Sequence, residues 1–279
     1  MEVGSSNIWR LGVGLLGIDQ MFDRGEGLPI VVIPGVQGRW EWMRPALDAL
    51  ARKCRTVSYS LCGDFGSGRT IDAAIGFENY LQQLDAVLED AGLRQTALCG
   101  VSYGGLVALR YAATRPHRVT ALILSSSPAP GWVPTEQQRR WVSRPWISAP
   151  AFIATSPGRL MPEIKAALPD WRRRIAFGAR HTIRVAAAPM IPSLMASRVT
   201  WTERMDFGPD CAKVTAPTLV ITGEDELDRV VPVRITRNYA AMIAGARHEV
   251  IEGTGHIGLL TRPERYAALV SEFVYANSH

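Results

Sequence analysis

Strand-like and helix-like segments alternate along this 279-residue chain from residue 28 onward. Continuous apolar runs of strand length, such as residues 28–33 and 96–101, are separated by segments whose apolar residues recur with the period of a helix. Strands that are apolar on both faces are typical of parallel sheets buried between helices. The alternation therefore predicts an α/β fold, with a mostly parallel central sheet and helices on both of its faces.

The other expected elements continue the same alternation. Further strands are expected at residues 55–61, 119–125, 217–222 and 248–251. Helices are expected at residues 41–53, 77–91, 106–113, 233–243 and 263–275. Gly92 directly follows the second of these helices, at the position where glycine commonly ends a helix.

The alternation is interrupted between residues 131 and 210, where prolines and tryptophans are frequent and clusters of β-branched residues are scarce. Short helical patterns recur there, at residues 135–142, 163–168 and 170–181. The segment is too long for a structureless loop. We therefore expect a core formed by residues 1–130 and 211–279, with residues 131–210 inserted as a helical cap. Such a cap would cover the carboxyl edge of the sheet, where open α/β sheets bind ligands.

Composition and charge argue against several other classes of protein. The chain is 47% hydrophobic and 20% charged, which is typical of a globular protein. No apolar run approaches the roughly 20 residues that a membrane-spanning helix requires. The net charge is +5, but the basic residues form no nucleic-acid-binding motif. We expect neither a membrane span nor a nucleic-acid partner.

Two further features bear on compartment and cofactors. Residues 11–18 are similar to the apolar part of a short signal peptide, but no small-residue cleavage site follows them, so a cytoplasmic location is expected. The cysteines have no spacing typical of a zinc site, and no metal or cofactor is expected. We interpret them as buried reduced thiols; a disulfide between Cys54 and Cys62 is the alternative for an exported protein. The four cysteines are Cys54, Cys62, Cys99 and Cys211.

A Gly-x-Ser-x-Gly motif lies between an expected strand and an expected helix, with Ser102 at its centre and Gly100 and Gly104 on either side. A serine on a sharp strand-to-helix turn needs small residues two positions away on both sides, because the strained backbone leaves no room for a Cβ atom there. The N-terminus of the following helix favours negative charge beside this serine. The motif alone is also compatible with a structural turn. Its context favours Ser102 as a nucleophile.

With the residues around it, this motif resembles the α/β-hydrolase family, and the resemblance extends from about residue 24 to residue 275. Members of that family carry a catalytic serine, an acid and a histidine in this order along the chain. The resemblance implies that His256, which lies between the last expected strand and the last expected helix, is the catalytic histidine. A loop histidine that caps the final helix is the alternative.

The sequence leaves more than one position for the acid. In the family, the acid usually stands three residues after a strand-ending glycine and four residues before a proline. Glu226 satisfies the first spacing from Gly223, whereas Asp228 satisfies the second spacing from Pro232. We favour Asp228, because the Asp-Arg-Val-Val-Pro run leads into the following helix as it does in the family. Asp225 and Glu226 remain alternatives.

The resemblance also implies an oxyanion hole after the strand at residues 28–33. Family members commonly have His-Gly at this point, whereas this chain has Pro34-Gly35. We expect the backbone N–H groups of Val36 and Tyr103 to be the two oxyanion donors. Residues 60–66 also depart from the family's usual pattern after the second strand, so the motifs do not assign a subfamily.

These residues together predict acyl transfer at a carbonyl group. His256 would take the proton of Ser102, Ser102 would attack the carbonyl carbon, and Asp228 would orient the imidazole. The expected protein is a carboxylesterase-like serine hydrolase that acts on a small-molecule ester. Lactonases, C–C bond hydrolases, perhydrolases and acyltransferases use the same triad, and a non-catalytic small-ligand receptor on this fold is an alternative of another class. The sequence does not define the oligomeric state.

Basic residues are concentrated in the expected cap. Residues 132–205 contain twelve Arg or Lys residues and four acidic residues. One interpretation is a solvated basic face, with arginine stems that cover apolar surface. The alternative is that some of these arginines line the entrance to the site and attract anionic substrates.

Overall fold

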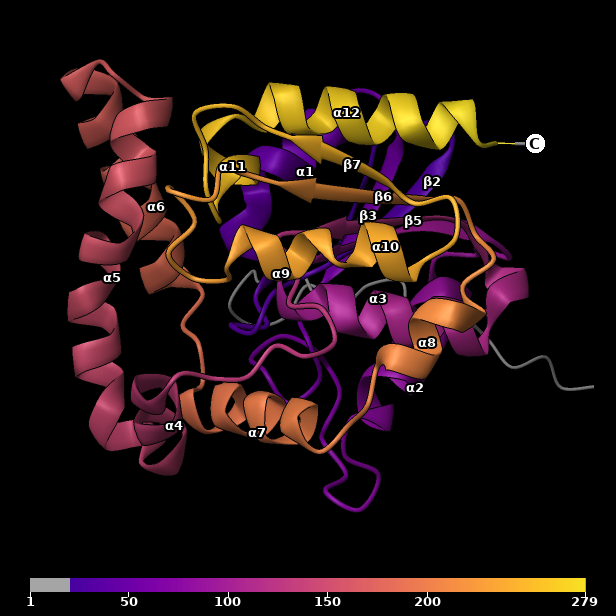
Figure 1. Cartoon of the computed structure of the whole chain (residues 1–279), viewed down its shortest axis with the longest axis horizontal. Helices are drawn as coiled ribbons and strands as arrows, with labels where there is room; N and C mark the ends of the chain where they lie inside the picture. The colour runs from indigo at the N-terminus through magenta and orange to yellow at the C-terminus, as the bar shows by residue number, and fades with distance from the viewer. Residues whose placement is uncertain (1–20, 279) are drawn as a thin grey trace, which may run out of the picture.

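The computed structural model describes residues 21–278 of the chain (Figure 1). Residues 1–20, which include the signal-like stretch 11–18, and residue 279 lie outside the described residues. The strands of the described part are β1 (Met21–Arg24), β2 (Pro29–Ile33), β3 (Arg55–Tyr59), β4 (Thr96–Val101), β5 (Val119–Ser125), β6 (Thr218–Thr222) and β7 (Arg247–Val250).

These strands form one sheet in the order β1-β3-β2-β4-β5-β6-β7. β1 pairs with β3 in antiparallel orientation, and all the other neighbouring pairs are parallel. The mostly parallel sheet predicted from the sequence is therefore confirmed. β1 has no counterpart among the predicted strands, because its four residues contain no continuous apolar run.

Helices cover both faces of this sheet (Figure 1). In the core they are η2 (Trp40–Met43), α1 (Arg44–Leu50), α2 (Glu78–Asp90), α3 (Tyr103–Thr114), η3 (Pro116–Arg118), α8 (Gly208–Lys213), α9 (Val233–Arg237), α10 (Tyr239–Met242), α11 (Gly258–Thr261) and α12 (Pro263–Ala276). The helix predicted at residues 233–243 is divided into α9 and α10 at Asn238.

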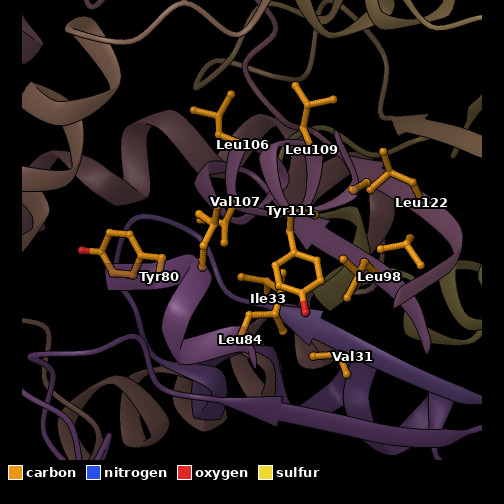
Figure 2. Close-up of a cluster of buried hydrophobic side chains, with 14 of the residues drawn as sticks. Val31, Ile33, Tyr80, Leu84, Leu98, Leu106, Val107, Leu109, Tyr111 and Leu122 are labelled. Atoms are coloured by element: carbon orange, nitrogen blue, oxygen red, sulfur yellow. The ribbon is translucent and has the colours of Figure 1, made fainter. Parts of the chain in front are cut away.

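Two buried apolar clusters hold the helices on the sheet. Val31 and Ile33 of β2 face the cluster that includes α2 and α3, whereas Ile30 and Val32 face the cluster that includes α1 and α12. This division follows from the alternation of side chains along a strand. Figure 2 shows the first cluster, in which side chains of α3 lie against those of β2 and β4. Burial of each such side chain contributes about 1.5–3 kcal/mol.

Four helices occupy the segment between β5 and α8, and we call them the helical insertion. They are α4 (Glu136–Ser143), α5 (Pro145–Ala167), α6 (Trp171–Ala187) and α7 (Pro192–Glu203). α5 lies at the edge of the molecule in Figure 1. α8 follows the insertion and packs on α3, and its Cys211 belongs to the core.

The long helix α5 differs most from the sequence expectation. The helical pattern predicts only residues 163–168 there, whereas the helix runs from residue 145 to residue 167. Pro150, Pro157 and Pro162 all lie inside it, and each removes one backbone donor and crowds the preceding turn. Because proline disfavours the helix interior, helix propensities do not predict this helix from the sequence. α7 is also unpredicted, because its apolar residues are not gathered on one face.

The structure also bears on the membrane span, the cysteines and the metal site that the sequence analysis considered. No helix among residues 21–278 is long and apolar enough to cross a membrane. All four cysteines are buried, and none forms a disulfide. Within the same residues, no three His, Cys, Asp or Glu side chains are grouped in a way that could hold a metal ion.

Candidate active site

Ser102 lies on the turn between β4 and α3 with φ 52° and ψ −120°, a conformation that non-glycine residues rarely adopt. Its N–H group donates to the carbonyl of Ser125 at 2.8 Å. A Cβ atom on Gly100 would lie 2.4 Å from the carbonyl oxygen of Gly104, and a Cβ atom on Gly104 would lie 2.3 Å from that of Ile33. The two glycines therefore permit the close backbone contacts that hold this strained turn.

The turn brings Ser102 to two residues that are distant in the sequence. Nε2 of His256 lies 3.2 Å from Oγ of Ser102, and Nδ1 of His256 lies 3.2 Å from Oδ2 of Asp228. Asp228 follows β6, and His256 follows β7, so both lie beyond the carboxyl ends of parallel strands. The three groups form a chain that can carry a proton from the serine to the histidine beside a carboxylate.

The alternative acids lie in a different environment from Asp228. Asp228 is 6% exposed, whereas Asp225 and Glu226 are both exposed to solvent. The N–H groups of Leu227 and Asp228 donate to the carbonyl of Glu224 at 3.1 and 3.0 Å, which folds this segment into a compact turn. The turn accommodates the additional residues before Asp228 and directs this side chain to His256.

The expected oxyanion donors belong to segments that border Ser102. Val36 and Tyr103 both line the pocket that contains this serine. A Cβ atom on Gly35 would lie 3.4 Å from Cβ of Ser102, so the loop at residues 34–36 passes directly beside the serine. Tyr103 is the first residue of α3, where backbone N–H groups have no partner within the helix.

The charges around His256 favour its protonated form. Burial lowers the pKa of His256, but the attraction of the Asp228 carboxylate, its hydrogen bond and the charge of Glu163 outweigh this effect. The pKa of His256 therefore lies above its ordinary value. A histidine base with a raised pKa needs a higher pH to be neutral.

A pocket of about 170 Å³ opens beside Ser102. The helical insertion contributes much of its wall through residues of α4, α5 and α7. The apolar part of the lining includes Leu106, Trp132, Trp141, Val142, Phe152, Met190, Met195 and Val199. Its polar side chains include Gln37, Gln138, Ser148 and Thr202, and no charged side chain is among the described residues that line it. The pocket is suited to a neutral and largely apolar ligand.

Three arginines of the insertion interact with side chains outside the reacting centre. Arg139 pairs with Glu203 at 3.2 Å, and Arg140 pairs with Glu136 four residues earlier on the same helix. The guanidinium of Arg159 lies over the ring of Phe152, 4.9 Å from its centre. These contacts agree with the interpretation of a largely solvated basic face. The alternative of an arginine-lined entrance has no support in the lining of the pocket.

Two residues that contact the site were not identified by the sequence analysis. Glu163 on α5 accepts a hydrogen bond from the N–H group next to His256, and Arg198 on α7 donates to the carbonyl of Val36. Both are common charged residues within helices of mixed composition. Only their burial, at 1% and 0% exposure, distinguishes them, and the sequence carries no signal for it.

Comparison with known proteins identifies the family of this chain. Residues 30–269 match the model of the alpha/beta hydrolase family. The chain belongs to this family. The mostly parallel sheet with helices on both faces is the architecture that the resemblance implies.

Curated relatives of this α/β hydrolase bear the names of hydrolases with different substrates. The 2-hydroxymuconate semialdehyde hydrolase of Pseudomonas sp. (strain CF600) is 27% identical, and the alignment covers 91% of this chain and 89% of the relative. The putative carbamate hydrolase RutD of Klebsiella pneumoniae (strain 342) is 26% identical, with coverage of 88% and 91%. The family is therefore clear, whereas the substrates named for these relatives differ.

Solved structures show the same architecture. A thermophilic esterase from Thermogutta terrifontis superposes with a TM-score of 0.76 at 25% identity, over 93% of each chain. The enol-lactonase from Burkholderia xenovorans LB400 superposes with a TM-score of 0.70 at 21% identity, over 91% of this α/β hydrolase and 95% of the lactonase. The second likeness concerns the fold alone.

Proposed function

We propose that this α/β hydrolase cleaves a neutral carboxylic ester through an acyl-enzyme on Ser102. The observation that carries the proposal is the chain of 3.2 Å contacts from Ser102 through His256 to Asp228, located beside an apolar pocket. This arrangement supplies a nucleophile, a base and a group that orients the base, which is the full set needed for acyl transfer.

The proposed reaction proceeds in two halves. Nε2 of His256 takes the proton of Ser102 while Oγ of Ser102 bonds to the ester carbonyl carbon, and the N–H groups of Val36 and Tyr103 stabilise the resulting oxyanion. The tetrahedral intermediate collapses, and His256 gives the proton to the departing alcohol. A water molecule, deprotonated by His256, then attacks the acyl-enzyme, and the acid is released as Ser102 regains its proton.

The pocket lining favours a neutral ester over an anionic substrate. The names of two relatives specify a derivative of 2-hydroxymuconate and a heptadienoate, which are carboxylates. A carboxylate that is buried without a cationic partner is costly, and the described lining contains no Arg or Lys. Large apolar side chains such as Trp141 and Phe152 instead suit an apolar acyl or alcohol group.

We also propose that the segment at residues 131–210 acts as the cap of this active site. Residues of α4, α5 and α7 line the same pocket as Ser102, so a substrate in the pocket would be enclosed between the insertion and the sheet. Enclosure excludes water from the substrate and strengthens the electrostatic interactions of the oxyanion. The insertion would thereby define which substrates fit.

Turnover of a short, neutral p-nitrophenyl ester by the purified protein tests the proposed function. We expect steady release of nitrophenol, and loss of this release when Ser102 is first labelled by a fluorophosphonate. A panel that includes lactones, a vinylogous C–C substrate and alcohol acceptors then distinguishes the other reactions that share the triad. Absence of both ester turnover and labelling would favour the non-catalytic receptor.

A further inference from the structure

A buried carboxylate of the helical insertion contacts the loop that carries the proposed catalytic histidine. Glu163 of α5 is 1% exposed, and its two oxygens accept the N–H group of Ile257 at 3.0 and 3.1 Å. Ile257 directly follows His256, and it lies 94 positions from Glu163 in the sequence. The backbone next to His256 is therefore hydrogen-bonded to a side chain of the insertion.

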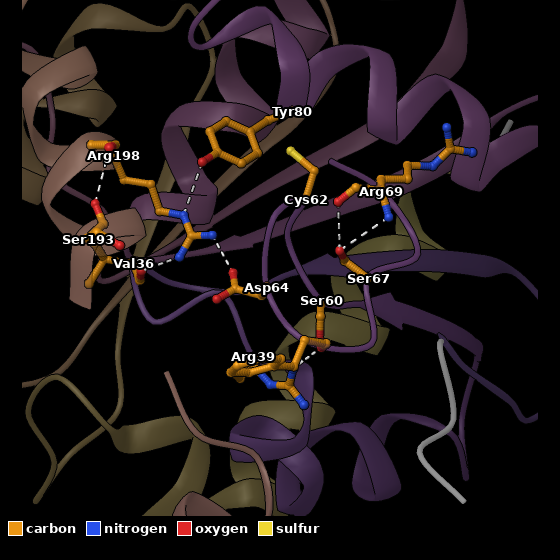
Figure 3. Close-up of polar contacts among 12 residues, drawn as sticks. Val36, Arg39, Ser60, Cys62, Asp64, Ser67, Arg69, Tyr80, Ser193 and Arg198 are labelled. Atoms are coloured by element: carbon orange, nitrogen blue, oxygen red, sulfur yellow. Dashed lines mark hydrogen bonds and ion pairs between the residues drawn. The ribbon is translucent and has the colours of Figure 1, made fainter. Parts of the chain in front are cut away.

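A buried guanidinium of the same insertion contacts the loop of the expected oxyanion donor (Figure 3). Arg198 of α7 is 0% exposed and donates to the carbonyl of Val36 at 2.8 Å. It also donates to the hydroxyl of Tyr80 at 3.1 Å and forms an ion pair with Asp64, whose side chain is equally buried. The planar guanidinium is thus oriented by several partners at once.

The two contacts are made to two different segments of the candidate site. Glu163 contacts the segment of the base, and Arg198 contacts the segment of an oxyanion donor. We propose that Glu163 and Arg198 are positioning residues, through which the helical insertion holds His256 and Val36 in their reactive geometry. The proposal depends on the proposed function for the roles of these two segments. The insertion would then position the reacting groups, in addition to forming a wall of the pocket.

The chemistry of the two contacts supports this role over simple packing. Hydrogen bonds that involve a charged group are shorter and stronger than neutral ones, so they define the position of a loop more closely. A charge buried inside the protein is costly unless it is paired, and Arg198 is paired with Asp64. The carboxyl groups that face this imidazole are Asp228, from the turn after β6, and Glu163, from α5. Burial raises the pKa of Glu163, and the charge of Glu163 in turn raises the pKa of His256.

Three variants test the role of Glu163. Glu163→Gln keeps an acceptor for Ile257 and removes the charge, so the pKa of His256, measured by NMR titration of its ring, should fall. Glu163→Ala removes the acceptor as well, so kcat should fall on the order of tenfold or more while KM changes less than about twofold. Glu136→Gln is the matched control, because Glu136 is an exposed glutamate of the same insertion and should leave both quantities unchanged.

The role of Arg198 is tested by its conservative replacement. Arg198→Lys keeps the positive charge beside Asp64 but cannot bind Tyr80, Val36 and Asp64 with one planar fork. We expect kcat to fall by roughly 10–100-fold with little change in KM, because the oxyanion is absent from the bound ester and develops only as Ser102 attacks. Arg139→Lys, at an exposed ion pair of the insertion, is the control and should retain full activity.

The readouts separate this proposal from a loss of folding and from the proposed function. Rates are expressed per site titrated to completion with fluorophosphonate, so unfolded molecules do not count. The NMR titration of His256 requires no turnover and remains informative if no ester is cleaved. The proposal would be overturned if the pKa of His256 were unchanged in both Glu163 variants and kcat per titrated site were unchanged in Arg198→Lys.

Discussion

Oδ2 of Asp228 lies 3.2 Å from Nδ1 of His256, although the two residues are 28 positions apart and follow different strands. The other oxygen of this carboxylate, Oδ1, accepts the N–H groups of Val230 and Val231 at 2.9 and 3.0 Å. The backbone of the same turn therefore orients the carboxylate, which leaves Oδ2 to face the imidazole. This relationship determines which tautomer of His256 is favoured, with the proton on Nδ1 and Nε2 free to accept.

Asp228→Asn should lower kcat by roughly 10⁴-fold, because an amide favours the wrong tautomer of the histidine. Asp225→Asn and Glu226→Gln are the matched controls, and both should stay within about twofold of the native rate, since exposed side chains make little difference to a buried site. Steady-state kinetics of the three single variants provide the measurement. Loss of activity in Asp225→Asn, together with full activity in Asp228→Asn, would contradict the proposed triad.

Ser102→Ala should fold as the native protein does and lose activity by a factor of up to about 10⁶. The variant should also fail to react with a fluorophosphonate that labels the native protein with one equivalent. Mass spectrometry of the labelled peptides identifies the site. Full activity of the alanine variant, or labelling at another residue, would show that Ser102 is not the nucleophile.

The pH profile should reflect the raised pKa of His256. Only the neutral imidazole can take the serine proton, so kcat/KM should be low at acidic pH and rise as His256 loses its proton. Because Asp228 and Glu163 raise the pKa of His256 despite its burial, the midpoint should lie above the ordinary value of about 6.5. A profile that is flat between about pH 5 and pH 8 would contradict a histidine base.

Gly104→Ala tests the steric requirement at the turn. The added Cβ would lie 2.3 Å from the carbonyl oxygen of Ile33 and 2.6 Å from that of Pro34, both of which are backbone atoms. We expect a loss of about 1–3 kcal/mol in the free energy of unfolding, together with a large loss of activity. Gly178→Ala in α6 is the control, because nothing lies within 4 Å of its added Cβ; it should stabilise the protein by up to about 1 kcal/mol. Chemical denaturation of both variants is the measurement, and equal stabilities would refute the steric argument.

The charge of the substrate should affect kcat/KM through the apolar lining of the pocket. The basic face of the insertion should have no effect on it. We expect a neutral ester to be preferred over its carboxylate-bearing analogue, because no charged side chain is among the described residues of the pocket lining. The two esters should respond alike when salt is raised from about 10 to 500 mM, since screening weakens only attraction at a distance. A selective loss of kcat/KM for the anionic ester at high salt would instead favour electrostatic attraction by the insertion.

Local sequence was sufficient for the fold class, and it indicated Ser102 as the candidate nucleophile. The alternation of apolar runs predicts the parallel sheet, because strands buried between helices must be apolar on both faces. Gly100 and Gly104 identify the turn at Ser102, since the steric limit they relieve involves only neighbouring residues and the adjoining strand. The resemblance to the family added His256 as a candidate, and this residue lies between the last strand and the last helix.

The remaining features depend on contacts between distant segments, which no local pattern records. Asp225, Glu226 and Asp228 have similar sequence surroundings, and only the turn at residues 224–228 brings the third of them to His256. Glu163 contacts a peptide 94 positions away, and Arg198 contacts one 162 positions away. Because burial and pairing of charge arise only when helices pack against the sheet, tertiary structure alone decided which charged residues of the insertion reach the site.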